Sequence, residues 1–98
     1  MSAFVFAYRQ SNGYKPSNES YPAWKEWFDG MGDHLSDLGA PVVQRATIGN
    51  CAPEATEFGG YSVIEADDLD SALTIAKGCP TMNRNGGVEV GLLGPVPA

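Results

Sequence analysis

The 98-residue sequence predicts a single α+β domain in which two helices cover one face of a four-stranded antiparallel sheet. Three observations support this fold class. Short runs of aromatic and β-branched residues alternate with two amphipathic segments in the order β-α-β-β-α-β. Hydrophobic residues make up 43% of the chain and charged residues 18%, which is a globular composition. Each amphipathic segment is followed closely by Gly and Pro, as helix ends commonly are.

The first strand is predicted over residues 3–9, AFVFAYR. Because alternate side chains of a strand point to opposite faces, its aromatic side chains share one face and its small aliphatic side chains share the other. The aromatic set is Phe4, Phe6 and Tyr8, and the aliphatic set is Ala3, Val5 and Ala7. Both faces are apolar, so we expect a central strand, or a sheet whose second face is also covered.

A loop over residues 10–20 leads into a helix that we predict from Ser20 to about Leu38. Ser20 suits the N-cap and Pro22 suits the first turn, where its missing N–H costs nothing. The apolar side chains repeat at helical spacing along one stripe. They are Trp24, Trp27, Phe28, Met31, Leu35 and Leu38. Gly39 then suits a left-handed helix stop.

The rest of the chain predicts two strands, a helix and a last strand, at residues 42–48, 61–66, 69–77 and 88–93. The intervening and terminal segments, 49–60, 81–87 and 94–98, are loop, turn and irregular tail by composition. Asp67 or Asp68 suits the cap of this helix, and Gly78 its end. The complete order is the ferredoxin-like pattern, which leaves one sheet face bare. A bare apolar face predicts a homodimer in which a second copy packs sheet to sheet.

The composition also excludes classes of function. The net charge is −6 and the six Lys and Arg are scattered, so we expect no nucleic-acid or anionic-membrane partner. No apolar run approaches the roughly 20 residues of a membrane span, and the N-terminus lacks signal-peptide features. We therefore expect a cytoplasmic protein. Cys51, Cys79 and the single histidine lack zinc-site spacing, and no glycine-rich loop resembles a phosphate-binding loop, so we expect no metal or cofactor.

Two stretches carry a family resemblance. Residues 59–80 read GGYSVIEADDLDSALTIAKGCP, and residues 86–90 read GGVEV. They match a pattern of Gly-Gly, a strand ending Ile-Glu-Ala, an acidic cap, a helix, Cys-Pro and then Gly-x-Val-Glu-Val. The sequence thus resembles the YCII-related proteins, and more closely their DGPF-motif branch. The resemblance implies a dimeric α/β barrel with a cleft between the sheet and the partner chain.

Two family positions differ in this sequence. The His that many YCII-type members carry in the first helix aligns near Trp27 or Phe28, where no His is present. The DGPF motif falls near residues 50–54, which read NCAPE and lack its Asp and Gly. The scaffold pattern is kept while both positions linked to family chemistry are changed. This combination favours a binding or accessory role over catalysis.

Glu65 is the first candidate functional residue. Strand alternation places it with Tyr61 and Val63 on the open face of the sheet. A carboxylate there can pair with a cation of the partner chain, orient a ligand or act as a base. A sheet-rim or interface carboxylate is the structural alternative. Tyr8 and Arg9 can line the same cleft, although Arg9 can equally face solvent at a strand end.

His34 and the tryptophans are further candidates. His34 lies near Trp27 on the predicted helix, with Asp37 three residues on as a candidate hydrogen-bond partner. It is either a structural residue or a general base. Trp24 and Trp27 share one stripe, and either pack in the core or stack on a ligand. Cys51 lies in a loop and would be a nucleophile only beside a cation or a helix N-terminus.

Two hypotheses of different class follow. The first is a non-catalytic protein that binds a small molecule, or acts as an accessory protein, at a cleft of the dimeric barrel. The second is a cofactor-free lyase or isomerase acting on a ring or enol substrate. In it Glu65 or His34 carries the proton, and Tyr8, Tyr61 and Arg9 orient the substrate. Regulatory interaction with another protein is a third hypothesis.

Overall fold

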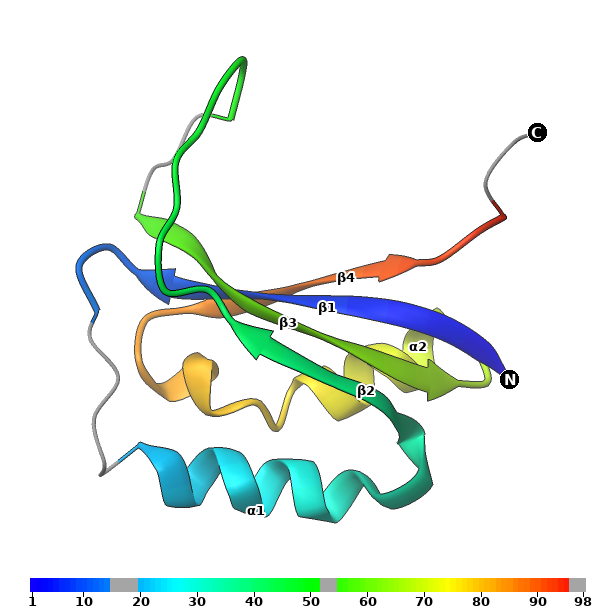
Figure 1. Cartoon of the computed structure of the whole chain (residues 1–98). Coiled ribbons are helices and arrows are strands. Elements are labelled where there is room, and N and C mark those ends of the chain that lie inside the picture. Colours follow the sequence, from blue (N-terminus) through cyan, green and yellow to red (C-terminus); the bar gives the residue numbers. More distant parts are fainter. Residues whose placement is uncertain (15–19, 52–54, 96–98) are drawn as a thin grey trace.

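A computed structural model describes residues 1–14, 20–51 and 55–95. Strands and helices follow in the predicted order (Figure 1). The elements are β1 (Ser2–Ser11), α1 (Tyr21–Met31), β2 (Leu35–Pro41), β3 (Thr56–Ala66), α2 (Leu69–Ala76) and β4 (Gly87–Leu92). Two short 3-10 helices, η1 (Gly32–His34) and η2 (Pro80–Asn83), follow α1 and α2.

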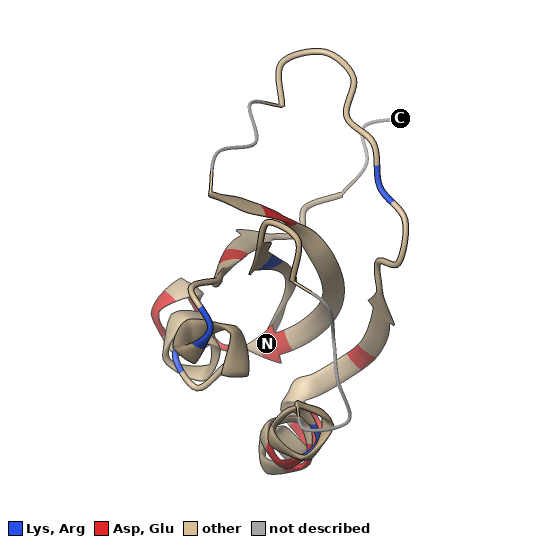
Figure 2. Ribbon diagram, turned by 90° about the vertical axis from the view of Figure 1, so that its left-hand side faces the viewer, with Lys and Arg blue, Asp and Glu red and all other residues tan. Residues whose placement is uncertain are grey.

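The four strands form one sheet in the order β2-β3-β1-β4, and all neighbours are antiparallel. Both helices lie on the same face of this twisted sheet, as the end-on view shows (Figure 2). The α+β, ferredoxin-like prediction is therefore confirmed. β1 and β3 are the central strands, and they carry the side chains on which the helices pack.

The predicted alternation of β1 is also confirmed. Phe4, Phe6 and Tyr8 are 1%, 0% and 6% exposed and face the helices, whereas the small aliphatic side chains between them are only half-buried. The core that these rings join comes from β1, β3, α1, α2 and the turn after α2. Its other buried members are Met31, Ile64, Ala66, Ala72, Ala76 and Cys79.

The first helix is shorter than predicted. It ends at Met31 because Gly32 has φ 56° and ψ −126°, a conformation that breaks the helix and that glycine adopts readily. Leu35 then pairs with Ile64 in β2, so the residues after His34 are strand and not helix. The three-residue spacing of Leu35 and Leu38 fits a helix, but pairing with β3, which includes register shifts between Leu35 and Ala40, places both in a strand.

The second strand was predicted at the wrong place, because residues 42–48 form no strand. After Val42 donates to the Gly59 carbonyl at 3.1 Å, the chain leaves the sheet and projects from it (Figure 1). Val43 and Ile48 are 89% and 90% exposed. β3 already has β1 and β2 on its two sides, so this β-prone segment cannot pair with β3, and β2 occupies the place predicted for it.

The C-terminal half matches its prediction closely. Asp68 is the N-cap of α2, and its Oδ1 accepts the Ser71 N–H at 2.8 Å. β3 begins earlier than predicted, at Thr56, and η2 occupies part of the predicted turn. β1 and β4 each agree with the predicted bounds to within two residues.

Candidate functional site

A cavity of about 760 Å³ separates α1 from the sheet. α1 lies beneath β2 and apart from α2 (Figure 2), and the cavity is bounded by α1, β2, the adjoining ends of β1 and β3, and the turn after η2. Its lining is mainly apolar and includes six aromatic residues. The aromatic lining residues are Tyr8, Tyr14, Tyr21, Trp24, Phe28 and Tyr61. A concave, mainly apolar site of this size suits a small molecule.

The rings at the inner wall hold one another in fixed geometry. Trp24 meets Tyr8 edge to face, with the ring centroids 5.0 Å apart and an interplanar angle of 75°. On α1 itself, Trp24 contacts Phe28 at 5.7 Å and Trp27 at 5.8 Å. Edge-to-face and tilted pairs of this kind are favourable ring arrangements. The cluster thus presents a rigid aromatic surface.

The hydroxyl of Tyr8 is buried and has no hydrogen-bond partner of adequate geometry in the described part of the chain. The neighbouring Ser62 hydroxyl donates its own hydrogen to the Leu38 carbonyl at 2.6 Å. Burial raises the pKa of the Tyr8 hydroxyl, an increase that the Ser62 side chain partly offsets. Tyr8 is therefore neutral at physiological pH. An unsatisfied buried hydroxyl is costly, and a polar ligand atom would remove that cost.

Two cations border the same cavity, and they differ in their partners. Lys25 Nζ lies 2.6 Å from the Asp29 carboxylate, an exposed ion pair one turn along α1. Arg84, in the turn after η2, has a buried Nη1 that lacks a hydrogen-bond partner among the described residues. The cavity therefore combines an apolar wall with a covered cationic group and a covered hydroxyl.

A second, more open groove of about 570 Å³ runs between the two helices. Trp27 lines it and joins the helices, because its Nε1 donates to the Ile75 carbonyl at 3.2 Å. His34 and Glu26 also border this groove, and Arg84 borders both it and the aromatic cavity. Arg84 is thus common to the linings of the two spaces.

The residues predicted for the site are divided among several places. Tyr8, Tyr61 and Trp24 meet at the aromatic cavity, whereas Trp27 and His34 line the groove between the helices. The prediction that Tyr8, Arg9 and Glu65 share one cleft is wrong. Tyr8 faces the helices, and Arg9 is held at the strand end, where its Nη2 donates to the Thr56 carbonyl at 2.9 Å.

Glu65 and His34 do meet, but through the backbone of Glu65. His34 Nδ1 lies 2.8 Å from the Glu65 carbonyl oxygen, to which it donates in the corresponding tautomer. The predicted partner of His34, Asp37, instead accepts the Gly39 N–H at 2.9 Å. Glu65 lies opposite Ala3 in the register and is half-buried on the open sheet face. Its side chain lines neither of the two cavities.

Sequence reasoning did not select Arg84. Its position becomes informative only with the turn that carries it, because the Arg84 N–H donates to the Thr81 carbonyl at 3.0 Å and Asn85 has φ 59°. The stretch NRNGG did indicate a turn. The chain has only six Lys and Arg, so an arginine inside a predicted turn was the one sequence feature that could have marked Arg84 as a candidate binding residue.

Charges and thiols add little to this site. Lys and Arg do not gather on one face of the described chain (Figure 2), and its described residues contain no group of three metal-binding side chains. None of the helices it describes is long and apolar enough to cross a membrane. Both cysteines are free: Cys51 is exposed and Cys79 is buried, and burial raises the pKa of the Cys79 thiol.

Comparison with known proteins bears on the fold and the family. The family model of the YCII-related domain matches residues 1–93. No curated protein gives a significant match. A similar solved structure is 5-chloro-2-hydroxyhydroquinone dehydrochlorinase (TftG) from Burkholderia phenoliruptrix AC1100, in complex with 2,5-dihydroxybenzoquinone. The TM-score is 0.57 and the identity 16%, over 90% of this chain and 89% of that chain. At this identity the likeness shows a shared fold.

Proposed function

The chain belongs to the YCII-related domain family, and from that premise we propose that it binds a small ring-bearing molecule in the aromatic cavity between α1 and the sheet. The observation that carries the proposal is the buried Tyr8 hydroxyl, which lacks a partner at the wall of an aromatic-lined cavity. Apolar walls with a few polar groups are the usual composition of a small-molecule site. The complex of TftG with a dihydroxybenzoquinone supports a ligand of this size in this fold.

Intrinsic fluorescence offers a direct test, since Trp24 and Trp27 are the two tryptophans of the chain and Trp24 lines the cavity. We expect titration with monocyclic aromatics, 2,5-dihydroxybenzoquinone among them, to quench this fluorescence and to release heat in calorimetry. The variant Trp24→Leu removes an aromatic wall, and should weaken binding up to about tenfold.

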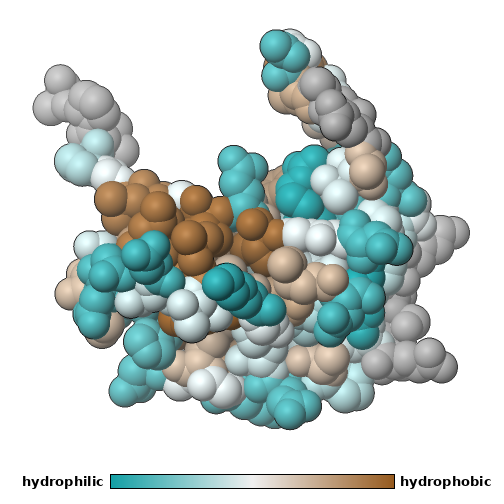
Figure 3. Space-filling view, turned by 180° about the vertical axis from the view of Figure 1, so that it is seen from behind, coloured by the Kyte–Doolittle hydropathy of each residue, from teal (hydrophilic) through white to brown (hydrophobic). Residues whose placement is uncertain are grey.

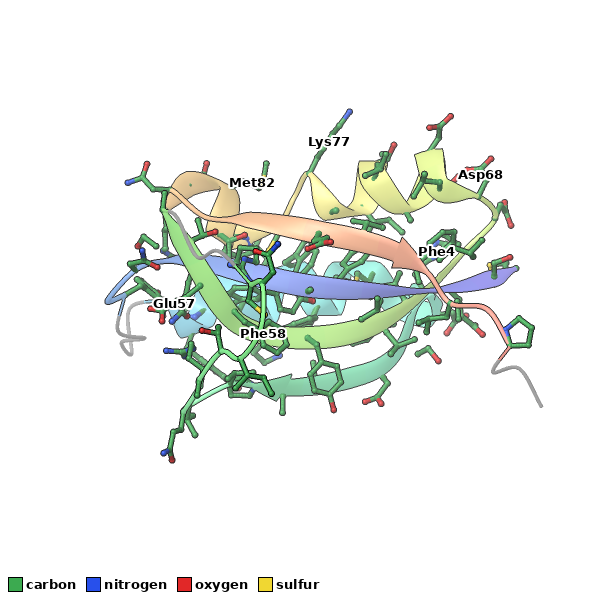
Figure 4. The ribbon with its side chains drawn as sticks, turned by 90° about the horizontal axis from the view of Figure 1, so that it is seen from above. Phe4, Glu57, Phe58, Asp68, Lys77 and Met82 are labelled. Atoms are coloured by element: carbon green, nitrogen blue, oxygen red, sulfur yellow. The ribbon has the colours of Figure 1, made fainter. Side chains whose placement is uncertain are left out.

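The matched control is Phe58→Leu. Phe58 is 38% exposed on β3 and lies outside both cavities, so the same aromatic-to-Leu change should leave affinity within about twofold (Figure 4). Calorimetry that finds no saturable binding of any aromatic probe by the natural sequence would sink the proposed function.

We further propose that a second copy of the chain covers the open face of the sheet. The segment after β2 and the segment after β4 both project on the side away from the helices, and they flank this face (Figure 1). Val5, Ala7 and Val63 lie on it as half-buried apolar side chains. Figure 3 shows a further apolar area on the molecule seen from behind, and Leu92 and Leu93 at the end of β4 are exposed.

Sedimentation tests the dimer directly. We expect a dimer at micromolar concentration, and the variant Val63→Lys to shift it toward the monomer, because a charge in an apolar interface is unfavourable. The control Leu69→Lys introduces the same charge at an exposed position on α2. A natural chain that sediments as a monodisperse monomer overturns this part of the proposal.

The other hypotheses remain predictions of the sequence. A lyase or isomerase that uses Glu65 or His34 would act at a cleft formed with the partner chain. A cytoplasmic location agrees with two free thiols, since oxidising compartments favour disulfides. Because the cavity is the feature with a defined chemistry, ligand binding is the function that we favour.

A further inference from the structure

The Arg84 guanidinium at the cavity wall has a nitrogen that is covered from solvent and lacks a hydrogen-bond partner among the described residues. Arg45 Nη1 pairs with the Glu57 carboxylate at 2.8 Å, and Lys25 pairs with Asp29. Arg84 has no such carboxylate among the described residues, although its Nη1 is covered from solvent. A guanidinium nitrogen that loses water without gaining a partner is destabilising, so the fold tolerates a cost at Nη1. An anion bound to this guanidinium would offset that cost.

The backbone that carries Arg84 is fixed on both sides. The N–H groups of Arg84 and Gly86 both donate to the Thr81 carbonyl at 3.0 Å. Asn85 has φ 59°, a left-handed conformation that asparagine adopts more readily than most residues. Gly86 follows in close contact with the Arg9 carbonyl, where a Cβ atom would overlap that oxygen. The turn therefore holds Arg84 at the cavity by its backbone.

The polar groups of the wall define the complementary ligand. A guanidinium offers only donors and a permanent positive charge, so it selects an anionic acceptor. The neutral Tyr8 hydroxyl can donate a second hydrogen bond to the same kind of group. The edge-to-face pair of Tyr8 and Trp24 favours a ring next to these donors.

We propose that the cavity selects planar molecules that carry an anionic oxygen, such as a phenolate, an enolate or an aromatic carboxylate, and that Arg84 binds this oxygen. This inference rests on the proposed ligand-binding function and adds the charge of the ligand to it. It assigns Arg84 the role of a binding residue that determines specificity.

A pair of probes with the same ring separates charge from shape. The probes are para-nitrophenol, at a pH at which it is ionised, and neutral nitrobenzene, with calorimetry as the measurement. The natural chain should bind the phenolate at least about tenfold more tightly, because a charge-assisted hydrogen bond contributes more than a neutral contact. Arg84→Met should remove at least about tenfold of the phenolate affinity, and change the nitrobenzene affinity by less than about twofold.

Lys77→Met is the matched control. It makes the same change of charge at an exposed lysine that lines neither cavity, so phenolate affinity should change by less than about twofold. If neither these two probes nor any other monocyclic aromatic binds the natural chain, the proposed function itself fails. If both probes bind equally well and Arg84→Met changes neither affinity, the cavity binds rings without regard to charge, and the present inference is overturned.

A spectroscopic measurement on the natural chain needs no variant. Absorbance distinguishes the phenolate from the phenol, so the ionisation midpoint of the bound probe can be compared with that of the free probe. A guanidinium beside the oxygen favours the anion and should lower the midpoint by about one pH unit. A midpoint that is unchanged or higher in the bound probe contradicts a role for Arg84. This test uses only the natural chain, so it decides the question even if the Arg84→Met variant does not fold.

Discussion

The two helices meet the same sheet in different ways. α2 presents small residues, and Ala72 and Ala76 are 0% and 6% exposed, so its backbone lies close to the sheet. α1 presents large rings, and Met31 is its one buried residue in the described chain. Rings the size of Trp24 and Trp27 keep the axis of α1 away from the sheet. The α2 side is therefore a packed core, while the α1 side contains the cavity.

The difference extends to the attachments of each helix. α2 begins at the Asp68 cap, whereas Ser20 occupies the N-cap position of α1 without a capping hydrogen bond from its side chain. α1 is attached by ring contacts, among them Trp27 stacked on Phe6 with centroids 6.2 Å apart. We infer that the α2 side supplies most of the stability and the α1 side supplies the site.

The largest expected effect tests this division of roles. Phe6→Ala empties a position that is 0% exposed between the helices and the sheet, and should lower the free energy of unfolding by about 3–5 kcal/mol. Phe28→Ala removes the same ring from a half-buried position at the cavity wall, and should cost about half as much. Urea denaturation measures both. Equal losses would contradict the view that α1 is the weaker attachment.

The same contrast explains which parts of the fold sequence analysis could predict. β1, β3 and α2 are specified by local patterns that agree with their packing, such as the alternating rings of β1 and the Asp68 cap. The end of α1 and the position of β2 depend on Gly32 and on pairing between Leu35 and Ile64. Neither fact is encoded in the spacing of apolar residues, which fits a longer helix equally well.

The candidate site shows a similar limit. Tyr8, Tyr61 and Trp24 were selected from the sequence, and they do meet at the cavity. Their common location could not be derived, because it depends on where α1 lies above the sheet. Arg84 was missed since its role comes from burial without a partner, a property of the packed structure.

The edge strand next to α1 offers the second test. Gly39 has φ 70° in β2, and a Cβ there would overlap the Tyr61 carbonyl. Gly39→Ala should destabilise the chain by about 1–2 kcal/mol from the left-handed backbone alone, with strand displacement adding to that cost. Thermal denaturation should show a lower melting temperature, together with weaker binding of aromatic probes.

A control for this substitution lies on α1. Gly30 is inside the helix, and a Cβ there would contact nothing within 4 Å. Gly30→Ala should therefore stabilise the chain by about 0.5–1 kcal/mol, through helix propensity and a less flexible unfolded chain. If Gly39→Ala did not lower the free energy of unfolding relative to the natural chain, β2 would not be the rigid border of the cavity that the structure indicates.

Tyr8→Phe gives a smaller effect on stability and separates the two roles within one side chain. The ring stays in place against Trp24, while the hydroxyl without a partner is removed. The free energy of unfolding should stay unchanged or rise by about 1 kcal/mol, and affinity for para-nitrophenolate should fall by about tenfold. A clear loss of stability in denaturation would show that the hydroxyl is satisfied within the folded chain.

The smallest expected effect is on how stability depends on pH, through the Glu57 carboxylate near the end of the sheet. Figure 4 shows Glu57 near one end of the sheet and Asp68 at the start of α2. The Gly13 N–H, at 2.9 Å, and the nearby Arg45 hold the pKa of Glu57 below its ordinary value. Because this pKa is depressed in the folded state, Glu57 stabilises the fold above about pH 4.3 and less as the pH falls further. Glu57→Gln should therefore lower stability at neutral pH and weaken its decline in acid, as thermal melts across pH would report.

Asp68→Asn on the α2 side completes this comparison. The Ser71 N–H lowers the pKa of Asp68, so this carboxylate also loses its contribution in acid. Asparagine is an equally good N-cap, so Asp68→Asn should keep most of the stability at neutral pH while removing the titration. Glu57→Gln has no such replacement, because its amide cannot form the ion pair with Arg45. Both variants could instead show the same small change in stability at neutral pH. The ion pair between Arg45 and Glu57 would then contribute nothing to holding the segment after β2 against β3. The α1 side would depend on its ring contacts and strand pairing alone.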